Sequence, residues 1–267
     1  MIKHSLELTE QTEGLWFIVN RGRIWLTPQQ QLPQGTLQLF PVAKAPEQYC
    51  WIGEHQQQNC YLVIDHNQIQ DEQQWVSPRE LLVMGENIFQ LAARAIQVAL
   101  FLQTHRFCGQ CGCAMHLVNW ELAMLCHKCG HRCYPRIAPC VLVAIVRDKQ
   151  ILLARSSRHR KGFFSILAGF VESAETLEQA AIREVKEEVG VDIGNLRYAG
   201  SQPWPFPHSL MAGFIADYNA GDIVCQPHEI EEAYWFELDK LPEIPPVETL
   251  SGQIIRQLQR TLVDNQK

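Results

Sequence analysis

The sequence lacks the features of a membrane protein and of a strongly basic nucleic-acid-binding protein. Its longest apolar runs, such as residues 141–146, are far shorter than the ~20 residues that a transmembrane helix needs. The formal net charge is -6 at pH 7, which leaves room only for a local basic patch. The first residues lack the layout of a secretory signal, and residues 264–267 match no peroxisomal or lipidation motif. We therefore expect a cytoplasmic protein with no membrane partner.

Cysteine is the residue type that needs an explanation. The chain contains 10 cysteines, and most of them crowd into residues 108–133. A chain without an export signal keeps its thiols reduced, so disulfides explain this cluster poorly. A metal site explains it better, because thiolates in close sequence spacing are typical zinc ligands.

Two C-x-x-C knuckles lie in this cluster, Cys108 with Cys111 and Cys126 with Cys129. Their spacing is that of a zinc ribbon, in which each knuckle brings two thiolates to one tetrahedral ion. Four thiolates fill the coordination shell, so the pattern predicts a structural zinc ion rather than a catalytic one. The surplus thiols of Cys113 and Cys133 could each replace a neighbouring ligand. The alternative is a set of free thiols.

The predicted ribbon also carries basic and aromatic residues, a combination that can bind single-stranded nucleic acid. They are Arg106, Lys128, Arg132, Arg136, Trp120 and Tyr134. The alternative is a surface of ordinary charge, and for the ribbon by itself this alternative is favoured. A zinc-ribbon nucleic-acid-binding protein is therefore kept as a second hypothesis for the function.

The region before the ribbon shows no catalytic signature and is interpreted as a scaffold or dimerisation domain. Residues 1–76 are typical of β-structure, with a hairpin turn at 20–23. A helix is expected to begin at Ser77, because Pro78 suits its first position and Glu80 completes a capping box. Gly85 is expected to interrupt it before a longer amphipathic helix that leads into the ribbon.

From Pro139 onward the pattern alternates between strands and helices. Strands are expected at 141–146, 151–154, 164–167, 196–199, 211–216 and 233–237, and helices at 176–189 and 252–263. The first of these helices is expected to be capped at Thr176 and to end at Gly190. The sequence thus predicts an α+β protein of three domains. These are an N-terminal β-rich domain with a linking helix (1–104), a zinc ribbon (105–136) and a C-terminal domain (137–267).

The helix expected at 176–189 carries the most informative residues. Glu184, Glu187 and Glu188 are three or four positions apart, so they share one helix face. Three carboxylates repel one another unless a cation lies among them, and Mg²⁺ or Mn²⁺ prefers oxygen ligands. The alternative is a solvated acidic face neutralised by Arg183 and Lys186, and spacing alone leaves the two interpretations about equal.

The longer segment around this helix resembles the Nudix box of the Nudix hydrolase family. The matched positions are Gly169, Glu175, Arg183, Glu184, Val185, Glu187, Glu188, Gly190 and Val191. The resemblance implies an α/β/α sandwich with a mixed sheet, which cleaves a nucleoside diphosphate linked to another group. It also implies that Glu184, Glu188 and the carbonyl of Ala168 bind the catalytic Mg²⁺ or Mn²⁺. Glu187 is implied as ligand or base, and Arg183 as the residue that orients a carboxylate.

A second motif, SQPWPFPHS at 201–209, combines three prolines with two aromatic rings. The prolines are expected to hold the backbone in an extended, stiff loop, and the rings offer flat surfaces on which a base could stack. The alternative is a proline-rich connector with buried aromatic residues. The motif resembles the signature of the NADH pyrophosphatase branch of the Nudix family. With the ribbon included, the resemblance covers nearly the whole chain and is weakest over its first residues.

This branch implies an activity, partners and further site residues. The activity is hydrolysis of NAD(H) to nicotinamide mononucleotide and AMP, and removal of NAD caps from RNA 5′ ends to leave 5′-monophosphate RNA. A homodimer is implied, in which both subunits contact the substrate, and Glu229 is implied as a further metal ligand. Substrate contacts are implied for Arg79, Glu121, Tyr134, Phe170, Gln202, Pro203, Trp204, Pro205, Phe206, Pro207, His208, Ser209 and Ser251. A nucleic-acid-binding protein with a weakly active Nudix domain, or a hydrolase of another nucleoside diphosphate such as ADP-ribose, is the alternative.

Overall fold

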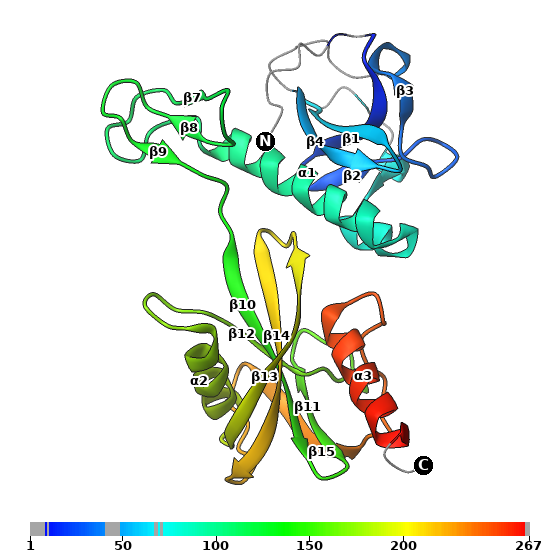
Figure 1. Ribbon diagram of the computed structural model, residues 1–267, viewed down its shortest axis with the longest axis vertical. Coiled ribbons are helices and arrows are strands. Elements are labelled where there is room, and N and C mark those ends of the chain that lie inside the picture. The colour runs from blue at the N-terminus through cyan, green and yellow to red at the C-terminus, as the bar shows by residue number, and fades with distance from the viewer. Residues whose placement is uncertain (1–8, 10, 41–48, 67–68, 70–71, 265–267) are drawn as a thin grey trace. The chain divides into compact units, whose positions relative to one another are not determined.

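A computed structural model describes residues 9, 11–40, 49–66, 69 and 72–264 (Figure 1). The chain forms two compact units, and the border between them lies between Arg136 and Ile137. Residues 205–208 group with the first unit, although they are inserted in the sequence of the second. The β-rich stretch predicted at 1–76 lies partly outside the described residues, as does the C-terminal tetrapeptide. No helix in the described part of the chain is both long and apolar enough to cross a membrane.

The first unit is built around a six-stranded sheet in the order β4-β5-β1-β2-β6, with β3 paired to β1. Its strands are β1 (Glu13–Asn20), β2 (Arg23–Trp25), β3 (Gln34–Thr36), β4 (Tyr49–His55), β5 (Gln58–Ile64) and β6 (Trp75–Val76). The predicted hairpin turn at 20–23 is confirmed, because Arg21 and Gly22 both have positive φ, at 47° and 74°, between β1 and β2. Two positive φ values match the twist of the flanking strands.

The predicted helix start at Ser77 is confirmed, with one difference in helix type. The capping box of Ser77 and Glu80 is formed, but the segment that follows (η4, Pro78–Met84) is a 3-10 helix. Gly85 interrupts it with a φ of 104°, and α1 (Glu86–Thr104) then begins. The apolar face of α1 packs on the sheet through Leu91, Ala95 and Ile96, among others. After α1 come the three short strands of the ribbon, β7 (His116–Leu117), β8 (Met124–Leu125) and β9 (Arg132–Cys133).

The second unit is a mixed sheet covered on both faces by helices, so the predicted α/β/α sandwich is confirmed. The strands follow the order β13-β14-β10-β11-β15, and β12 pairs with β10. They are β10 (Ala138–Arg147), β11 (Gln150–Ser156), β12 (Leu167–Phe170), β13 (Asp192–Trp204), β14 (Ser209–Ala220) and β15 (Ile230–Glu237). β10 and β14 are parallel, whereas the other neighbours are antiparallel.

Alternation along β10 sets the two faces of this sheet. Val141, Val143 and Ile145 point into the core that holds α2 (Leu177–Val189). Leu142 and Ala144, the residues between them, point into the core that holds α3 (Leu250–Asp264). Figure 1 shows α2 and α3 on opposite sides of the sheet. A strand with both faces covered is apolar throughout, as residues 141–146 are in the sequence.

The strand predicted at 164–167 is wrong, because the observed strand β12 begins only at Leu167. Phe164 and Ile166 are buried in one core and Leu167 in the other, which produced an apolar run resembling a strand. The backbone there makes only isolated bridges, from Ser165 to Ala154 and from Phe163 to Glu243. Burial without a continuous partner strand explains the error.

Of the extended loop expected at 201–209, only residues 205–208 lie outside the strands, and they form a turn rather than an extended segment. Residues 201–204 continue β13, and only 205–208 form the turn before β14, with a cis peptide bond between Phe206 and Pro207. Pro203 is tolerated in a strand because β13 lies at the edge of the sheet, where a missing N–H breaks no ladder.

Candidate active site and metal centres

The helix α2 is fixed at both ends by the residues that its sequence predicted. Thr176 is the N-cap: its hydroxyl accepts from the Gln179 backbone N–H at 3.2 Å, while the Gln179 side chain accepts from the Thr176 N–H at 2.9 Å. At the other end Gly190 takes a left-handed conformation with a φ of 78°. These caps fix where the helix begins and ends. Its buried residues Ala181, Val185 and Val189 turn one face toward the sheet, which sets where its carboxylates point.

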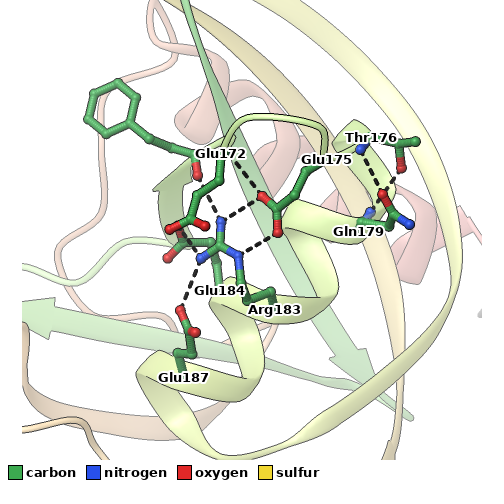
Figure 2. A network of polar contacts seen from close by, with 8 residues as sticks. Glu172, Glu175, Thr176, Gln179, Arg183, Glu184 and Glu187 are labelled. Atoms are coloured by element: carbon green, nitrogen blue, oxygen red, sulfur yellow. Dashed lines mark hydrogen bonds and ion pairs between the residues drawn. The ribbon is translucent and has the colours of Figure 1, made fainter.

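Arg183 joins three carboxylates of the Nudix-like segment (Figure 2). Its Nε and Nη2 donate to both oxygens of Glu175, at 2.6 and 2.9 Å, and Nη2 also donates to the Phe170 carbonyl at 3.0 Å. Its Nη1 lies 3.0 Å from an oxygen of Glu184 and 3.0 Å from one of Glu187. The bidentate contact with the guanidinium lowers the pKa of Glu175 to about 2. Arg183 therefore holds the loop before α2 against the helix.

Glu188 is the carboxylate that this network leaves without a partner. Its side chain is buried at 7% exposure, and its Oε2 has no hydrogen-bond partner among the described residues. Burial, followed by repulsion from Glu184, Glu229 and Glu187, raises its pKa to about 8. Burial likewise raises the pKa of Glu184. Unpaired buried carboxylates are costly, so the donor set fits a hard divalent cation such as Mg²⁺ or Mn²⁺.

Glu184, Glu188 and Glu229 line a cleft of about 420 Å³ in the second unit. The predicted residues Ala168, Phe170, Glu184, Glu188 and Glu229 all lie along it. Arg183 and Glu187 lie beside these residues without lining the cleft itself. Four elements meet here: the end of β11, the strand β12, the helix α2 and the residues before β15. Carboxylates distant in sequence are thereby brought together around one space.

Gly169 allows this close approach of helix and strand. A Cβ atom at this position would lie 1.9 Å from Cδ and 2.2 Å from Oε2 of Glu184. Glycine is therefore needed here for space and not for an unusual φ, because the Glu184 carboxylate lies directly over its Cα. The position of the Glu184 carboxylate therefore requires glycine at position 169.

The ribbon brings its four predicted cysteines to one point. The sulfurs of Cys108, Cys111, Cys126 and Cys129 all lie within 4.8 Å of one another. Sγ of Cys108 is 3.6 Å from that of Cys129, and Sγ of Cys111 is 3.5 Å from that of Cys126. A tetrahedral ion with Zn–S bonds of ~2.3 Å requires similar sulfur–sulfur edges. The geometry fits one structural zinc ion.

The surplus cysteines lie outside this set. The thiol of Cys133 contacts Nε2 of His131 at 3.2 Å, and the carbonyl of Cys113 accepts from the N–H of Cys108. Each knuckle closes with a glycine of positive φ, Gly112 at 73° and Gly130 at 76°. Their N–H groups donate to the carbonyls of Cys108 and Cys126, both at 2.9 Å. The two knuckles are thus built alike, which supports a shared ligand.

The remaining predicted substrate residues fall in two places. The second unit contains Gln202, Pro203, Trp204, Ser209 and Ser251, and the first unit contains Arg79, Glu121, Tyr134, Pro205, Phe206, Pro207 and His208. In the first unit, Oε1 of Glu121 accepts from Trp120, Arg132 and Tyr134, and the Arg79 guanidinium lies 4.4 Å from the Phe206 ring centroid. In the second, the buried Gln202 amide bonds to the backbone of Glu248 and Leu250.

Sequence reasoning missed part of the cleft. Glu172, His228 and the residues 156–159 also line it. A signal for the last group exists in the sequence, because Arg158, His159, Arg160 and Lys161 form a basic run separated by three residues from the strand predicted at 151–154.

Comparison with known proteins gives consistent matches for both parts of the chain. The NUDIX domain model matches residues 136–258, and the NADH pyrophosphatase zinc ribbon domain model matches residues 103–134. A protein of Edwardsiella ictaluri named NAD-capped RNA hydrolase NudC is 48% identical over 93% of this chain and 94% of its own length. Two proteins of the same name, from Pectobacterium atrosepticum and an Enterobacter species, are each 47% identical over 91% of this chain and over 90% and 91% of their own.

The first prediction concerns the four-thiolate centre. We expect about one zinc ion per purified chain, and Cys126→Ser should remove it because three thiolates leave the shell open. Cys225→Ser is the matched control, since that half-buried cysteine lies outside the cluster. Elemental analysis measures the zinc content of the two variants, and thermal unfolding measures their stability. Full zinc content in Cys126→Ser would show that the ligand set is wrong.

The second prediction concerns Gly169. Gly169→Ala should displace the Glu184 carboxylate and weaken binding of Mn²⁺ about tenfold or more, as loss of ligand support typically does. Gly194→Ala is the control, because the three atoms nearest to its Cβ would all belong to the side chain of the exposed Asn219, which can move aside. The affinity for Mn²⁺ is measured by a titration in which electron paramagnetic resonance detects the free ion. Equal affinity in Gly169→Ala and wild type would contradict the close packing of Gly169 against Glu184.

Proposed function

We propose that this chain, which belongs to the Nudix hydrolase family, hydrolyses the diphosphate bond of NAD(H) and removes NAD caps from RNA 5′ ends. The products are nicotinamide mononucleotide with AMP in the first case, and with 5′-monophosphate RNA in the second. One observation carries the proposal: the buried, unpartnered carboxylate of Glu188 shares a cleft with Glu184 and Glu229 on a complete Nudix box. The names of the full-length relatives support the substrate class.

The roles of the acidic residues follow from their positions in the cleft. Glu184, Glu188, Glu229 and the Ala168 carbonyl would hold the catalytic ion, since all four residues line the same space. Bound Mg²⁺ or Mn²⁺ supplies charge screening of the diphosphate and a lower pKa for a coordinated water. Glu187, half-exposed and ion-paired to Arg183, would position that water and accept its proton. Arg183 would keep Glu184 and Glu187 in place.

Aromatic residues supply surfaces for the nucleotide bases in this proposal. Phe170 is 56% exposed at the cleft, which is unusual for phenylalanine and suits stacking on the nicotinamide. The other substrate contacts predicted from the sequence are retained as proposals. For Gln202 an indirect role is supported, because both ends of its amide are bonded to the backbone next to Ser251.

A homodimer, a cytoplasmic location and three domains complete the proposal. Family resemblance supports the dimer, and the strongly exposed apolar side chains of Val83 and Trp120 offer contact area in the first unit. Sedimentation equilibrium tests it, and a species of single-chain mass at micromolar concentration would refute it. The thiolate zinc centre supports a reducing compartment such as the cytoplasm. The division at 104, between the β-rich domain and the ribbon, is tested by limited proteolysis.

The third prediction tests the active site. Glu188→Gln should lower NADH hydrolysis about 100-fold or more, because losing even a supporting group of a metal ligand costs roughly 10–100-fold. Glu178→Gln is the matched control, since it is an exposed glutamate in the first turn of the same helix α2. Product formation with added Mg²⁺ or Mn²⁺ is measured by chromatography. Full activity in Glu188→Gln, or turnover that ignores added ions, would overturn the mechanism.

The fourth prediction tests the substrate class. NADH and NAD-capped RNA should both be cut faster than ADP-ribose, because the proposed aromatic contacts act on the nicotinamide half. Equal kcat/KM values for NADH and ADP-ribose would favour the alternative of a general nucleoside diphosphate hydrolase. Tight RNA binding combined with no cleavage of any of the three would favour the nucleic-acid-binding alternative.

A further inference from the structure

We infer that the turn after β11 is a phosphate-binding wall of the cleft, in which Arg158 contacts an anionic phosphate oxygen of the substrate. The inference rests on the proposed function and adds a residue to it. Residues 156–159 line the same cleft as Glu184, Glu188 and Glu229. A cation and the metal-binding carboxylates therefore face one space of about 420 Å³.

The charges that line the cleft show why such a cation is needed. Four of the lining residues are glutamates, namely Glu172, Glu184, Glu188 and Glu229. Arg158 is the sole lysine or arginine among the described residues that line it. A diphosphate carries about two negative charges, and divalent ions held by carboxylates meet only some of its oxygens. A guanidinium matches two phosphate oxygens at once, so it suits the remaining ones.

The turn that carries Arg158 is held in place by a buried arginine. Arg155 is 5% exposed, and its Nε and Nη2 contact Glu232 at 2.7 and 2.5 Å, while Nη2 also lies 2.5 Å from Glu231. Its Nη1 donates to the His159 carbonyl at 3.4 Å. Arg155 therefore ties the turn to β15, the strand that begins directly after Glu229. This single side chain thus links the turn to the start of β15, next to the proposed metal ligand Glu229.

Further contacts within the turn fix its shape. The N–H of His159 donates to the Ser156 carbonyl at 3.0 Å, and the rings of His159 and Phe163 pack edge to face with centroids 5.1 Å apart. The pairing of β11 with β15 shifts register between Arg155 and Ser156. Such bulges occur next to active sites because they re-aim the side chains that follow. Arg158 thus lies on a preorganised turn.

The neighbouring cations of the same run do not share this position. Arg160 forms an ion pair with Glu243, and Lys161 is exposed without lining the cleft. Arg158 forms no ion pair within the described part of the chain, so its guanidinium is available for a ligand. The run therefore contains one cation that lines the cleft and one comparable cation that does not and can serve as its control.

The fifth prediction compares two substitutions that remove the same charge from the same turn. Arg158→Gln should raise the KM for NADH about tenfold or more, because it removes a charge-assisted hydrogen bond to phosphate. The Kd for NADH, measured by calorimetry without added divalent ions, should rise by about the same factor. Lys161→Gln should change both less than twofold. Arg158→Lys should recover part of the loss, since it restores the charge without the fork. Zinc content and melting temperature should stay at wild-type values in all three.

The outcomes separate this inference from the proposed function. If wild-type protein cuts NADH and Arg158→Gln matches it in KM and Kd, the phosphate contact is refuted and the proposed function stands. If Lys161→Gln weakens NADH binding as much as Arg158→Gln does, non-specific electrostatic attraction to the basic run explains the effect of both substitutions. The inference of a specific Arg158 contact is then also refuted. If the wild type fails to cut NADH with Mg²⁺ or Mn²⁺, the proposed function fails. Calorimetric binding of inorganic pyrophosphate to the same variants then still tests Arg158.

Discussion

The second unit depends on one electrostatic constraint: several carboxylates share a small space, and the most buried of them has no partner. Arg183 neutralises Glu175 and the outer sides of Glu184 and Glu187, but it does not contact Glu188. The pKa of Glu188 is raised to about 8 because its charged form is both desolvated and repelled. A buried carboxylate of this kind indicates a cation-binding site. A cation bound beside it would offset both the desolvation of its charge and the repulsion from the neighbouring carboxylates.

The sheet itself creates the space in which these carboxylates meet. Along one edge, β10 pairs with β14 over nearly its whole length, so both β11 and β12 must use its other edge. β11 takes residues 145–147 and β12 takes residues 140–143, and the chain between them bridges back to β11 where Ser165 meets Ala154. The cleft opens where these two partners diverge. Gly169 then lets α2 approach β12 closely enough to place Glu184 at the opening.

The sequence correctly predicted the features that depend on residues close together in the chain. The capping box at Thr176, the left-handed Gly190 and the cysteine knuckles all depend on residues a few positions apart. The errors and omissions involve contacts between distant segments. Residues 164–166 are buried without a continuous partner strand, and Arg155 reaches Glu231 and Glu232 across the sheet. No window of the sequence contains both partners of such a contact, so periodicity could not reveal it.

The cysteine cluster and the acidic cleft differ in ligand chemistry and in geometry, and this difference predicts different roles. In the ribbon, four thiolates surround one point, and a tetrahedral ion bound there has no free position for a substrate. In the cleft, the proposed ligands would come from α2, β12 and the residue before β15, and they make up only part of its lining. The rest of the lining includes Phe170 and Arg158, which offer a flat apolar surface and a cation. A cleft whose lining includes an aromatic residue and an arginine beside the proposed metal ligands suits a charged nucleotide.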